Sequence, residues 1–456
     1  MHVHLIAPSN EDSTYIKPLW VATLAAHTPA DVEVTFRDDG IEPIDLSREL
    51  DGLHRPPDLV GISVSSKTAA RAYAIADAYR ARGVKVVLGG IHVTALPEEG
   101  REHADAVVAG EAEGLWREVL ADARAGKLGR TRSLASPGIY RHEGFPTLEG
   151  LPIPRRDLFT SRRYVPFDVV QTTRGCPFPC EFCSVSTYNG TTFRFRPVPE
   201  VIRELETTGP RVLFGDDNVM VHARYSHELF EAMVPLKKAW VAQASLAVLD
   251  KLENVEIMAR AGCKALFIGF ESVDDATVRS VGKRQNKPTK YADIVRKLAD
   301  NGIAVWGSFV FGLDEDRPES FDRTVEFCIR SKLTMALFAL LTPYPGTRLY
   351  KRLEAERRLT KPRWWLEADH DAGAPFYAPK QMPREVLREA WIKSWRAMYS
   401  YGSIARRYDP AFDHSWIQNL AYWPINLLMH ELAERKIAGG DRSFRKHRAL
   451  DVPFGL

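Results

Sequence analysis

Short apolar runs alternate with helical segments through most of this chain, and this alternation constrains the fold more than any other feature. Within the first 125 residues, the segment 67–83 carries alanine and apolar residues at helical spacing between two such runs and stops at a glycine. Strands that alternate with helices in this way favour a doubly wound parallel sheet. We predict such a sheet for residues 1–125. Its strands are expected at 2–8, 32–36, 58–65, 85–90 and 106–110.

A second series of strand signals follows and predicts a different architecture. Strand-helix units in long succession favour a barrel-like parallel sheet, complete or partial, with its chemistry at the carboxyl ends of the strands. We therefore expect an α/β protein in which a linker at 126–165 leads to a partial (β/α)6 barrel at 166–348. The barrel strands are expected at 168–173, 211–217, 240–246, 265–272, 304–312 and 335–344.

The last part of the chain, 349–456, is predicted to form a helical C-terminal domain rich in aromatic residues. Examples are the segments 385–402 and 419–436. One interpretation is a helical cap that packs its tryptophans against the barrel. The other is a lid that meets an apolar substrate or a membrane surface.

Composition excludes some classes of partner. Lysine and arginine number 62 against 59 acidic residues, so there is no broad basic field of the kind that marks nucleic-acid binders. The N-terminal residues lack the features of a secretory signal, and no run of eighteen apolar residues predicts a transmembrane helix. We expect a cytoplasmic protein, in which clustered cysteines more often hold a metal than form a disulfide.

Three of the five cysteines, Cys176, Cys180 and Cys183, lie close together with the spacing C-x3-C-x2-C. A structural zinc site takes four protein ligands, but the next histidine is His222 and the other cysteines are far along the chain. A four-iron cluster takes four thiolates, so three cysteines leave one iron open to another ligand. An iron-sulfur cluster is therefore favoured over a zinc knuckle or a chance grouping.

The stretch "CPFPCEFC", which carries an aromatic residue just before its third cysteine, resembles the signature loop of the radical S-adenosylmethionine (SAM) enzymes. This resemblance implies a 4Fe–4S cluster held by Cys176, Cys180 and Cys183. It also implies that the open iron chelates the amino and carboxylate groups of SAM, which is then cleaved to methionine and a 5′-deoxyadenosyl radical.

The same resemblance implies where SAM is bound. "FGDDN" ends the second barrel strand, where the family contacts the methionine amino group, and "GFES" ends the fourth, where it places a polar ribose contact. The stretch 307–316 resembles the family's fifth strand near adenine. Carboxylates at strand ends also serve as helix N-caps, which is the alternative reading. The candidate SAM contacts are Asp216, Asp217, Gln243, Glu271 and Ser272.

Two further cysteines, Cys263 and Cys328, lie in apolar surroundings and are expected to be core thiols. Neither is proposed as a ligand of the cluster.

Doubly wound sheets bind ligands beyond the carboxyl ends of their strands, so a flat ligand could lie across those loops of the first domain. The pattern "DLVGIS…VVLGGIHVT.LPEE…HADAVVAGEAE", with "FIGFES…GKRQN" and "LTPYPGTRLY" later on, resembles the cobalamin (B12)-binding-domain radical SAM proteins. This resemblance implies cobalamin between the loops 8–13, 63–66, 89–94 and 110–113 and the barrel mouth. The candidate cobalamin contacts are Pro8, Ser9, Ser63, Ser65, Gly89, Gly90, His92, Gly110 and Glu111.

The first loop of the N-terminal domain also indicates whether the protein supplies a ligand to the cobalt. Proteins that ligate cobalt through histidine carry D-x-H-x-x-G there, whereas residues 8–18 contain no histidine. His2 and His4 lie inside the strand, and His92 follows a different strand and could instead be a capping residue. We expect cobalamin with its own base displaced and no protein nitrogen in its place.

By resemblance, the function is that of a cobalamin-dependent radical SAM C-methyltransferase. It would methylate an unactivated carbon of a small, lipid or polycyclic molecule through methylcobalamin and the 5′-deoxyadenosyl radical, with electrons from a donor such as flavodoxin or ferredoxin. One alternative keeps these cofactors but forms a ring or oxidises the substrate without methyl transfer. The other is a noncatalytic iron-sulfur binding or sensor protein. The substrate cannot be read from these motifs.

Overall fold

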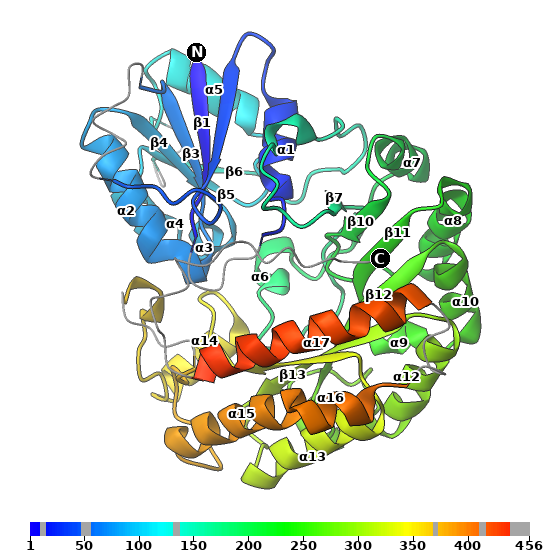
Figure 1. Cartoon of the computed structure of the whole chain (residues 1–456). Coiled ribbons are helices and arrows are strands. Elements are labelled where there is room, and N and C mark those ends of the chain that lie inside the picture. The colour runs from blue at the N-terminus through cyan, green and yellow to red at the C-terminus, as the bar shows by residue number, and fades with distance from the viewer. Residues whose placement is uncertain (10–14, 47–55, 131–136, 368–372, 410–415, 438–456) are drawn as a thin grey trace.

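The computed structural model describes residues 1–9, 15–46, 56–130, 137–367, 373–409 and 416–437. Two parallel six-stranded sheets dominate it, one in each half of the chain (Figure 1). A smaller antiparallel pair, β8 (Thr173–Arg174) with β9 (Arg194–Phe195), lies beside the second sheet.

The first sheet has the strand order β2-β1-β3-β4-β5-β6. The order reverses at β1, as in doubly wound folds, which confirms the predicted class. The strands are β1 (His2–Ala7), β2 (Glu33–Asp38), β3 (Leu59–Ser63), β4 (Lys85–Gly89), β5 (Ala106–Ala109) and β6 (Ile139–Arg141). β6 pairs with β5, so this sheet continues past residue 125 into the segment expected to be a linker.

Helices cover both faces of the first sheet. The helices are α1 (Leu19–His27), α2 (Ala69–Arg80), α3 (Ile91–Ala95), α4 (Pro97–His103) and α5 (Trp116–Arg124). Residues of α2 and α3 join one buried apolar cluster with the sheet, and residues of α1 and α5 join the other. Strands buried on both faces explain the continuous apolar runs in the sequence.

The second sheet has the sequential order β14-β13-β12-β11-β10-β7, with every neighbouring pair parallel. Its strands are β7 (Asp168–Val170), β10 (Arg211–Phe214), β11 (Ala239–Ala244), β12 (Cys263–Glu271), β13 (Ala304–Phe311) and β14 (Met335–Leu340). The two outermost strands are not paired with each other, so the barrel is partial.

The two faces of the barrel sheet have different surroundings. Alternate residues such as Ala242, Leu266 and Val305 point into the large core shared with the helices. The residues between them line the other side, which we call the inner face. The helices next to the sheet are α7 (Val198–Glu206), α8 (Ala223–Met233), α9 (Leu246–Leu249), α10 (Leu252–Arg260), α11 (Asp275–Ser280), α12 (Tyr291–Asp300) and α13 (Pro318–Arg330).

C-terminal helices follow the last barrel strand in the described part of the chain. They are α14 (Arg348–Ala355), α15 (Arg384–Tyr399), α16 (Tyr401–Arg407) and α17 (Trp416–Ile437). Trp391 and Trp395 of α15 are buried, and their indole nitrogens donate to the Phe338 carbonyl at 2.8 and 3.1 Å. These tryptophans thus cap the barrel. Trp364 and Trp365 instead join the core of the first sheet.

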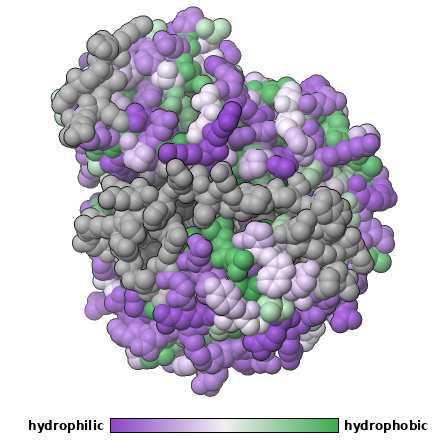
Figure 2. All heavy atoms as spheres, viewed as in Figure 1, coloured by the Kyte–Doolittle hydropathy of each residue, from purple (hydrophilic) through white to green (hydrophobic). Residues whose placement is uncertain are grey.

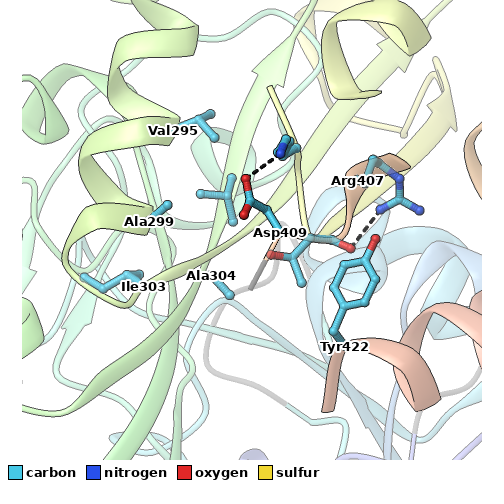
Figure 3. A pocket seen from close by; sticks show the side chains of 10 residues that line it. Val295, Ala299, Ile303, Ala304, Arg407, Asp409 and Tyr422 are labelled. Carbon is cyan, nitrogen blue, oxygen red and sulfur yellow. Dashed lines mark hydrogen bonds and ion pairs between the residues drawn. The ribbon is translucent and has the colours of Figure 1, made fainter. Parts of the chain in front are cut away.

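A small cavity lies at the amino-terminal end of β13, remote from the cysteine loop. Arg407, Asp409 and Tyr422 line it together with Ala304 (Figure 3). Its volume of about 20 Å³ is enough for one water molecule but not for a substrate.

Hydrophilic side chains cover most of the described surface in the view of Figure 2. No helix among the described residues is both long and apolar enough to cross a membrane.

Candidate active site at the barrel mouth

The cysteine loop leaves the barrel at the carboxyl end of the sheet, just after β8. Cys176 and Cys183 are partly buried and Cys180 is buried. The pKa of all three thiols is raised, chiefly by burial, and that of Cys180 reaches about 12. For Cys180 and Cys183 the neighbouring thiols contribute to the rise. A metal offsets this effect because it binds the thiolate and displaces the proton.

The arrangement of the thiols fits a cluster. Each of them lies close enough to another for their charges to interact. Among the described residues, no three cysteine, histidine or acidic side chains converge on the position of a single ion. A 4Fe–4S cluster does not need such convergence, because each thiolate binds a different iron.

The residues considered for a zinc site are used elsewhere. His222 is the N-cap of α8, where its Nδ1 accepts from the Tyr225 N–H at 3.2 Å. Cys263 and Cys328 are only 2% and 0% exposed within the core, as expected for structural thiols.

Asp216 holds the chain that leads into the cysteine loop. Its buried carboxylate accepts from the backbone N–H and the hydroxyl of both Thr172 and Thr173. Burial raises the pKa of Asp216 to about 6, against the effect of these donors. A SAM contact by Asp216 stays a prediction, since its described partners all belong to this loop.

Asp217 lies directly beside the cluster ligands. Its Oδ2 accepts from the Gly175 N–H at 3.0 Å and from the Asn189 amide at 3.3 Å. Its charge acts on the thiols of Cys176 and Cys183, and burial raises its own pKa. A carboxylate beside the thiols could meet the ammonium group of an amino-acid ligand, so the SAM contact of Asp217 stays a prediction.

The two residues between Cys180 and Cys183 fasten the loop to α14. Glu181 forms an ion pair with Arg352, and its carbonyl accepts from the Leu349 N–H at 3.0 Å. Phe182 packs against the apolar cluster that contains Leu349 and Leu353. The aromatic residue in "CEFC" therefore has a structural role in fixing the third cysteine.

Glu271 ends β12 in a strained position. Its φ of 64° lies in the left-handed region, and the register of β12 with β13 shifts just before it. Its carboxylate is buried and forms an ion pair with Lys283, whose Nζ also donates to the Gly269 carbonyl at 3.2 Å. The backbone thus bends to bring this pair to the barrel mouth.

Lys283 is a site residue that the sequence analysis did not single out, although it belongs to the quoted "GKRQN" stretch. Burial acts to lower its pKa, but the charges of Glu271 and of the Cys180 and Cys183 thiolates outweigh this and raise it. A permanent positive charge therefore faces the cluster and could meet the carboxylate of a bound amino acid.

Ser272 and Gln243, the other predicted SAM contacts, differ in exposure. Ser272 is buried, and its hydroxyl accepts from the N–H of Asp274, the N-cap of α11. Gln243 is exposed on the inner face near the end of β11. Of these two residues, only Gln243 exposes its side chain to the inside of the barrel.

The loops of the first sheet meet the cysteine loop across a pocket of about 210 Å³. Ser65, Ser66, Lys67 and Ile91 line it from the first sheet, and Ser184, Thr187, Tyr344 and Pro345 line it from the barrel side. Ser184 directly follows Cys183 in the chain. The pocket is therefore adjacent to the cluster loop and small hydroxyl side chains surround it, which fits part of a large amide-rich ligand.

Gly90 shows how closely these loops approach. Its φ is 103°, and an added Cβ would lie 2.7 Å from the Val64 carbonyl oxygen and 2.9 Å from the Ser63 hydroxyl. The Gly89 carbonyl also accepts from the Val64 N–H at 2.7 Å. Ser63, Gly89 and Gly90 thus join two adjacent loops at the pocket.

The first loop is described only at its start. The Ser9 hydroxyl donates to Asp39 at 3.0 Å, and Asp39 is paired with Arg71. Pro8 is partly buried beside it. Residues 10–13 of the predicted loop lie outside the described residues.

His92 is 1% exposed and both its ring nitrogens are used. Nδ1 bonds the Ser66 hydroxyl at 3.0 Å, and Nε2 bonds Glu99 at 2.9 Å. Glu99 also accepts from the Trp365 indole at 3.0 Å. His92 is therefore one residue removed from the pocket, behind Ser66.

Gly110 and Glu111 connect the first sheet to the cysteine loop. Glu111 is buried and forms ion pairs with Arg174 and Arg194. The Gly110 carbonyl accepts from the Tyr188 hydroxyl at 3.0 Å. These contacts fix the first sheet relative to the residue that lies two positions before Cys176.

Family models match the chain in the same order as its two sheets. The "B12 binding domain" model matches residues 11–120, and the "Radical SAM superfamily" model matches 170–328. A "Domain of unknown function (DUF4070)" model matches 347–426.

Curated relatives and solved structures extend this similarity over most of the chain. The bacteriochlorophyllide d C-12(1)-methyltransferase of Chlorobaculum tepidum is 29% identical over 94% of this chain and 91% of its own. The anaerobic magnesium-protoporphyrin IX monomethyl ester cyclase of Rubrivivax gelatinosus is 24% identical over 84% and 73%. The structure of TsrM, a radical SAM methyltransferase from Kitasatospora setae with cobalamin and a 4Fe–4S cluster bound, matches with a TM-score of 0.68 at 16% identity, over 98% of this chain and 99% of its own.

Proposed function

This chain belongs to the cobalamin-binding-domain-containing radical SAM family, and we propose that it is a C-methyltransferase that acts on an unactivated carbon of a small or polycyclic molecule. One observation carries the proposal: a single pocket is lined both by the loops of the first sheet and by Ser184, the residue after Cys183. A corrinoid held by those loops would lie next to SAM, as transfer of a methyl group to a substrate radical requires.

Different residues at the barrel mouth bind the cluster and SAM. Cys176, Cys180 and Cys183 hold the cluster, while Asp217 and Lys283 offer opposite charges to the ammonium and carboxylate of SAM. When bound, the cluster and SAM supply a carbon radical by one-electron cleavage, and the corrinoid supplies the methyl group.

The chain contributes position and charge. The Asp216 contacts and the Arg352–Glu181 pair fix the cysteine loop from two sides, so the ligand on the open iron has one orientation. The ion pairs of Glu111 hold the first sheet above it. The geometry is thus set before any substrate binds.

A corrinoid held at this pocket would meet no histidine among the described residues that line it. None of the described residues that line the pocket is a histidine, and both nitrogens of His92 are hydrogen-bonded behind it. A cobalt without a strong axial nitrogen releases a methyl group to a radical more readily.

The relative from Chlorobaculum tepidum favours methyl transfer, and its named substrate class is a tetrapyrrole. The Rubrivivax gelatinosus cyclase favours a second candidate, ring formation or oxidation with the same cofactors. A one-electron donor of the flavodoxin or ferredoxin type is part of either proposal.

The test is an anaerobic assay of reconstituted protein with SAM, a strong reductant and cobalamin, followed without any added substrate. We expect two products, 5′-deoxyadenosine from radical cleavage and S-adenosylhomocysteine from methyl transfer, the second only with cobalamin present. 5′-Deoxyadenosine alone would favour the cyclase-type alternative, and neither product would favour a noncatalytic binding protein.

A further inference from the structure

Three side chains form a row across the inner face of the barrel sheet. Gln243 of β11 is in register with Phe267 of β12, and Phe267 is in register with Trp306 of β13. Residues in register on neighbouring parallel strands point to the same side of the sheet. Their sequence neighbours Ala242, Leu266 and Val305 point into the helix-covered core, so this row faces inward.

The row is accessible rather than packed away. Gln243 is exposed, and Phe267 and Trp306 are each partly exposed, although all three lie within paired strands. On the far strand of the sheet, Ala339 of β14 is also exposed and adds little bulk. A ligand can therefore reach the row from the open side of the partial barrel.

The row has an apolar floor. Trp306 packs against a small cluster of Phe167, Val241 and Ala265, which lies one layer deeper on the inner face. This packing supports one side of the indole and leaves the remaining surface open. A rigid aromatic surface of this kind favours stacking with another ring.

The row also offers hydrogen-bond donors that no described residue uses. Neither the Gln243 amide nor the Trp306 indole N–H bonds to any residue within the described part of the chain, whereas Trp364, Trp391 and Trp395 all donate to carbonyls. Aromatic residues that are buried or half-buried normally find a partner for their polar atom. Both groups are partly or fully exposed and can donate to a ligand with an acceptor group.

Resting on the proposed function, we infer that Gln243, Phe267 and Trp306 form a platform for the substrate, which is a flat conjugated ring system carrying a carbonyl or carboxylate. Neighbouring strands lie about 4.8 Å apart, so a platform across three strands is about 10 Å wide, enough for a fused or macrocyclic ring. The Glu271–Lys283 pair ends β12 four residues beyond Phe267, which places SAM above the platform. The platform thus presents the ring edge to the radical.

The experiment compares two carboxylic acids that differ in flatness. Deuteroporphyrin IX is a conjugated planar macrocycle, and 5β-cholanic acid is a saturated polycycle. Porphyrin fluorescence anisotropy with the reconstituted protein gives the first affinity, and displacement of the porphyrin gives the second. We expect the porphyrin to bind about tenfold more tightly, because stacking and burial of a flat ring add to the apolar contact.

Variants locate the site. Trp306→Ala should weaken porphyrin binding about tenfold and Gln243→Leu about fivefold, while Trp306→Phe, which keeps a ring and the fold, should retain most of it. Tyr401→Ala is the control, because Tyr401 is an aromatic residue on α16 with 65% exposure, outside the barrel. SAM affinity should stay within about twofold of wild type in both Trp306 variants and in Tyr401→Ala. Gln243 is excluded from this comparison because it is also a predicted SAM contact.

Three results would overturn the inference. Equal affinity for the two acids would mean that the inner face recognises apolar bulk, and an unchanged Trp306→Ala variant would place the ring elsewhere. A parallel loss of SAM affinity would assign the platform to the adenine ring. None of these titrations requires SAM cleavage. The proposed function is tested by its own two products, 5′-deoxyadenosine and S-adenosylhomocysteine, so its failure can be distinguished from failure of the platform.

Discussion

At the barrel mouth a charged pair is buried beside the thiols, whereas the first-sheet residues that line the pocket present mainly hydroxyls, beside Lys67 and Ile91. Glu271 is held at a left-handed φ to meet Lys283 beside the thiols. Ser65 and Ser66 instead line a pocket with Ile91, and Gly90 lets the backbone approach closely. The mouth thus holds fixed charges beside the thiols, while the loops border a pocket of about 210 Å³.

The two sides are therefore suited to two kinds of recognition. Charge complementarity is costly to desolvate and needs fixed partners, so the barrel mouth carries strain and ion pairs. A large ligand gains affinity from its buried surface area and from many weak hydrogen bonds, so its binding depends on the size of the pocket more than on charge. Variants on the two sides should therefore fail in different ways.

The largest effect is expected on the barrel side from Cys180→Ala. Losing one of three thiolates should abolish the visible absorbance of the cluster and all 5′-deoxyadenosine, because no described cysteine nearby can replace it. The matched control is Cys263→Ala, a buried core thiol that should keep the iron content. If the Cys180 variant retained both absorbance and cleavage, the cluster would be assigned to the wrong residues.

Substitutions of Glu271 separate the effect of backbone strain on stability from the effect of the carboxylate on SAM binding. Glu271→Ala and Asp217→Ala should each weaken SAM binding about tenfold and leave iron content intact, since neither residue ligates the cluster. Glu271→Gly should relieve about 1 kcal/mol of backbone strain and yet lose the same SAM affinity. Isothermal titration with SAM measures the affinity, and thermal unfolding measures the strain. Unchanged SAM affinity in all three variants would move the SAM site elsewhere.

The first-sheet side is tested by Gly90→Ala. A Cβ there meets the Val64 backbone at 2.7 Å, so we expect a loss of more than about 1 kcal/mol of stability and weaker cobalamin binding. SAM cleavage to 5′-deoxyadenosine should remain. Gly402→Ala is the control, since nothing lies within 4 Å of the added Cβ. Loss of cluster assembly in the Gly90 variant would show that the two sides are not separable.

Much of the fold and of the candidate site could be predicted from the sequence. Both sheets were predicted, because strands buried on two faces read as plain apolar runs, and the cysteine spacing predicted the cluster loop. β6 was not predicted, since Ile139–Arg141 is three residues long and carries no periodic pattern. Such a strand exists only because β5 offers it an edge to pair with.

The side-chain roles were harder to predict. Lys283 follows Glu271 by twelve residues and meets it only because β12 bends at its end. Glu111 reads as a loop carboxylate, but Arg174 and Arg194 from the other half of the chain neutralise it. Contacts between distant segments leave no local signal, so His92 could not be told from a ligand-facing residue.

A smaller, spectroscopic effect concerns the cobalt. Electron paramagnetic resonance of the cob(II) form should lack nitrogen superhyperfine splitting, because we predict a displaced base and because both ring nitrogens of His92 are hydrogen-bonded to Ser66 and Glu99. The spectrum of His92→Ala should match that of wild type. A clear nitrogen triplet in wild type that disappeared in the variant would assign the axial ligand to His92.

In the proposed function the methyl group and the radical meet at the same substrate carbon. The most direct measurement is the mass of products formed when the reconstituted enzyme and cobalamin act on a cell extract with methyl-deuterated SAM. For methyl transfer we expect a product that carries all three deuterons of one methyl group and forms together with 5′-deoxyadenosine. A product that appears with 5′-deoxyadenosine but contains no deuterium would contradict methyl transfer and support ring formation or oxidation at the same site.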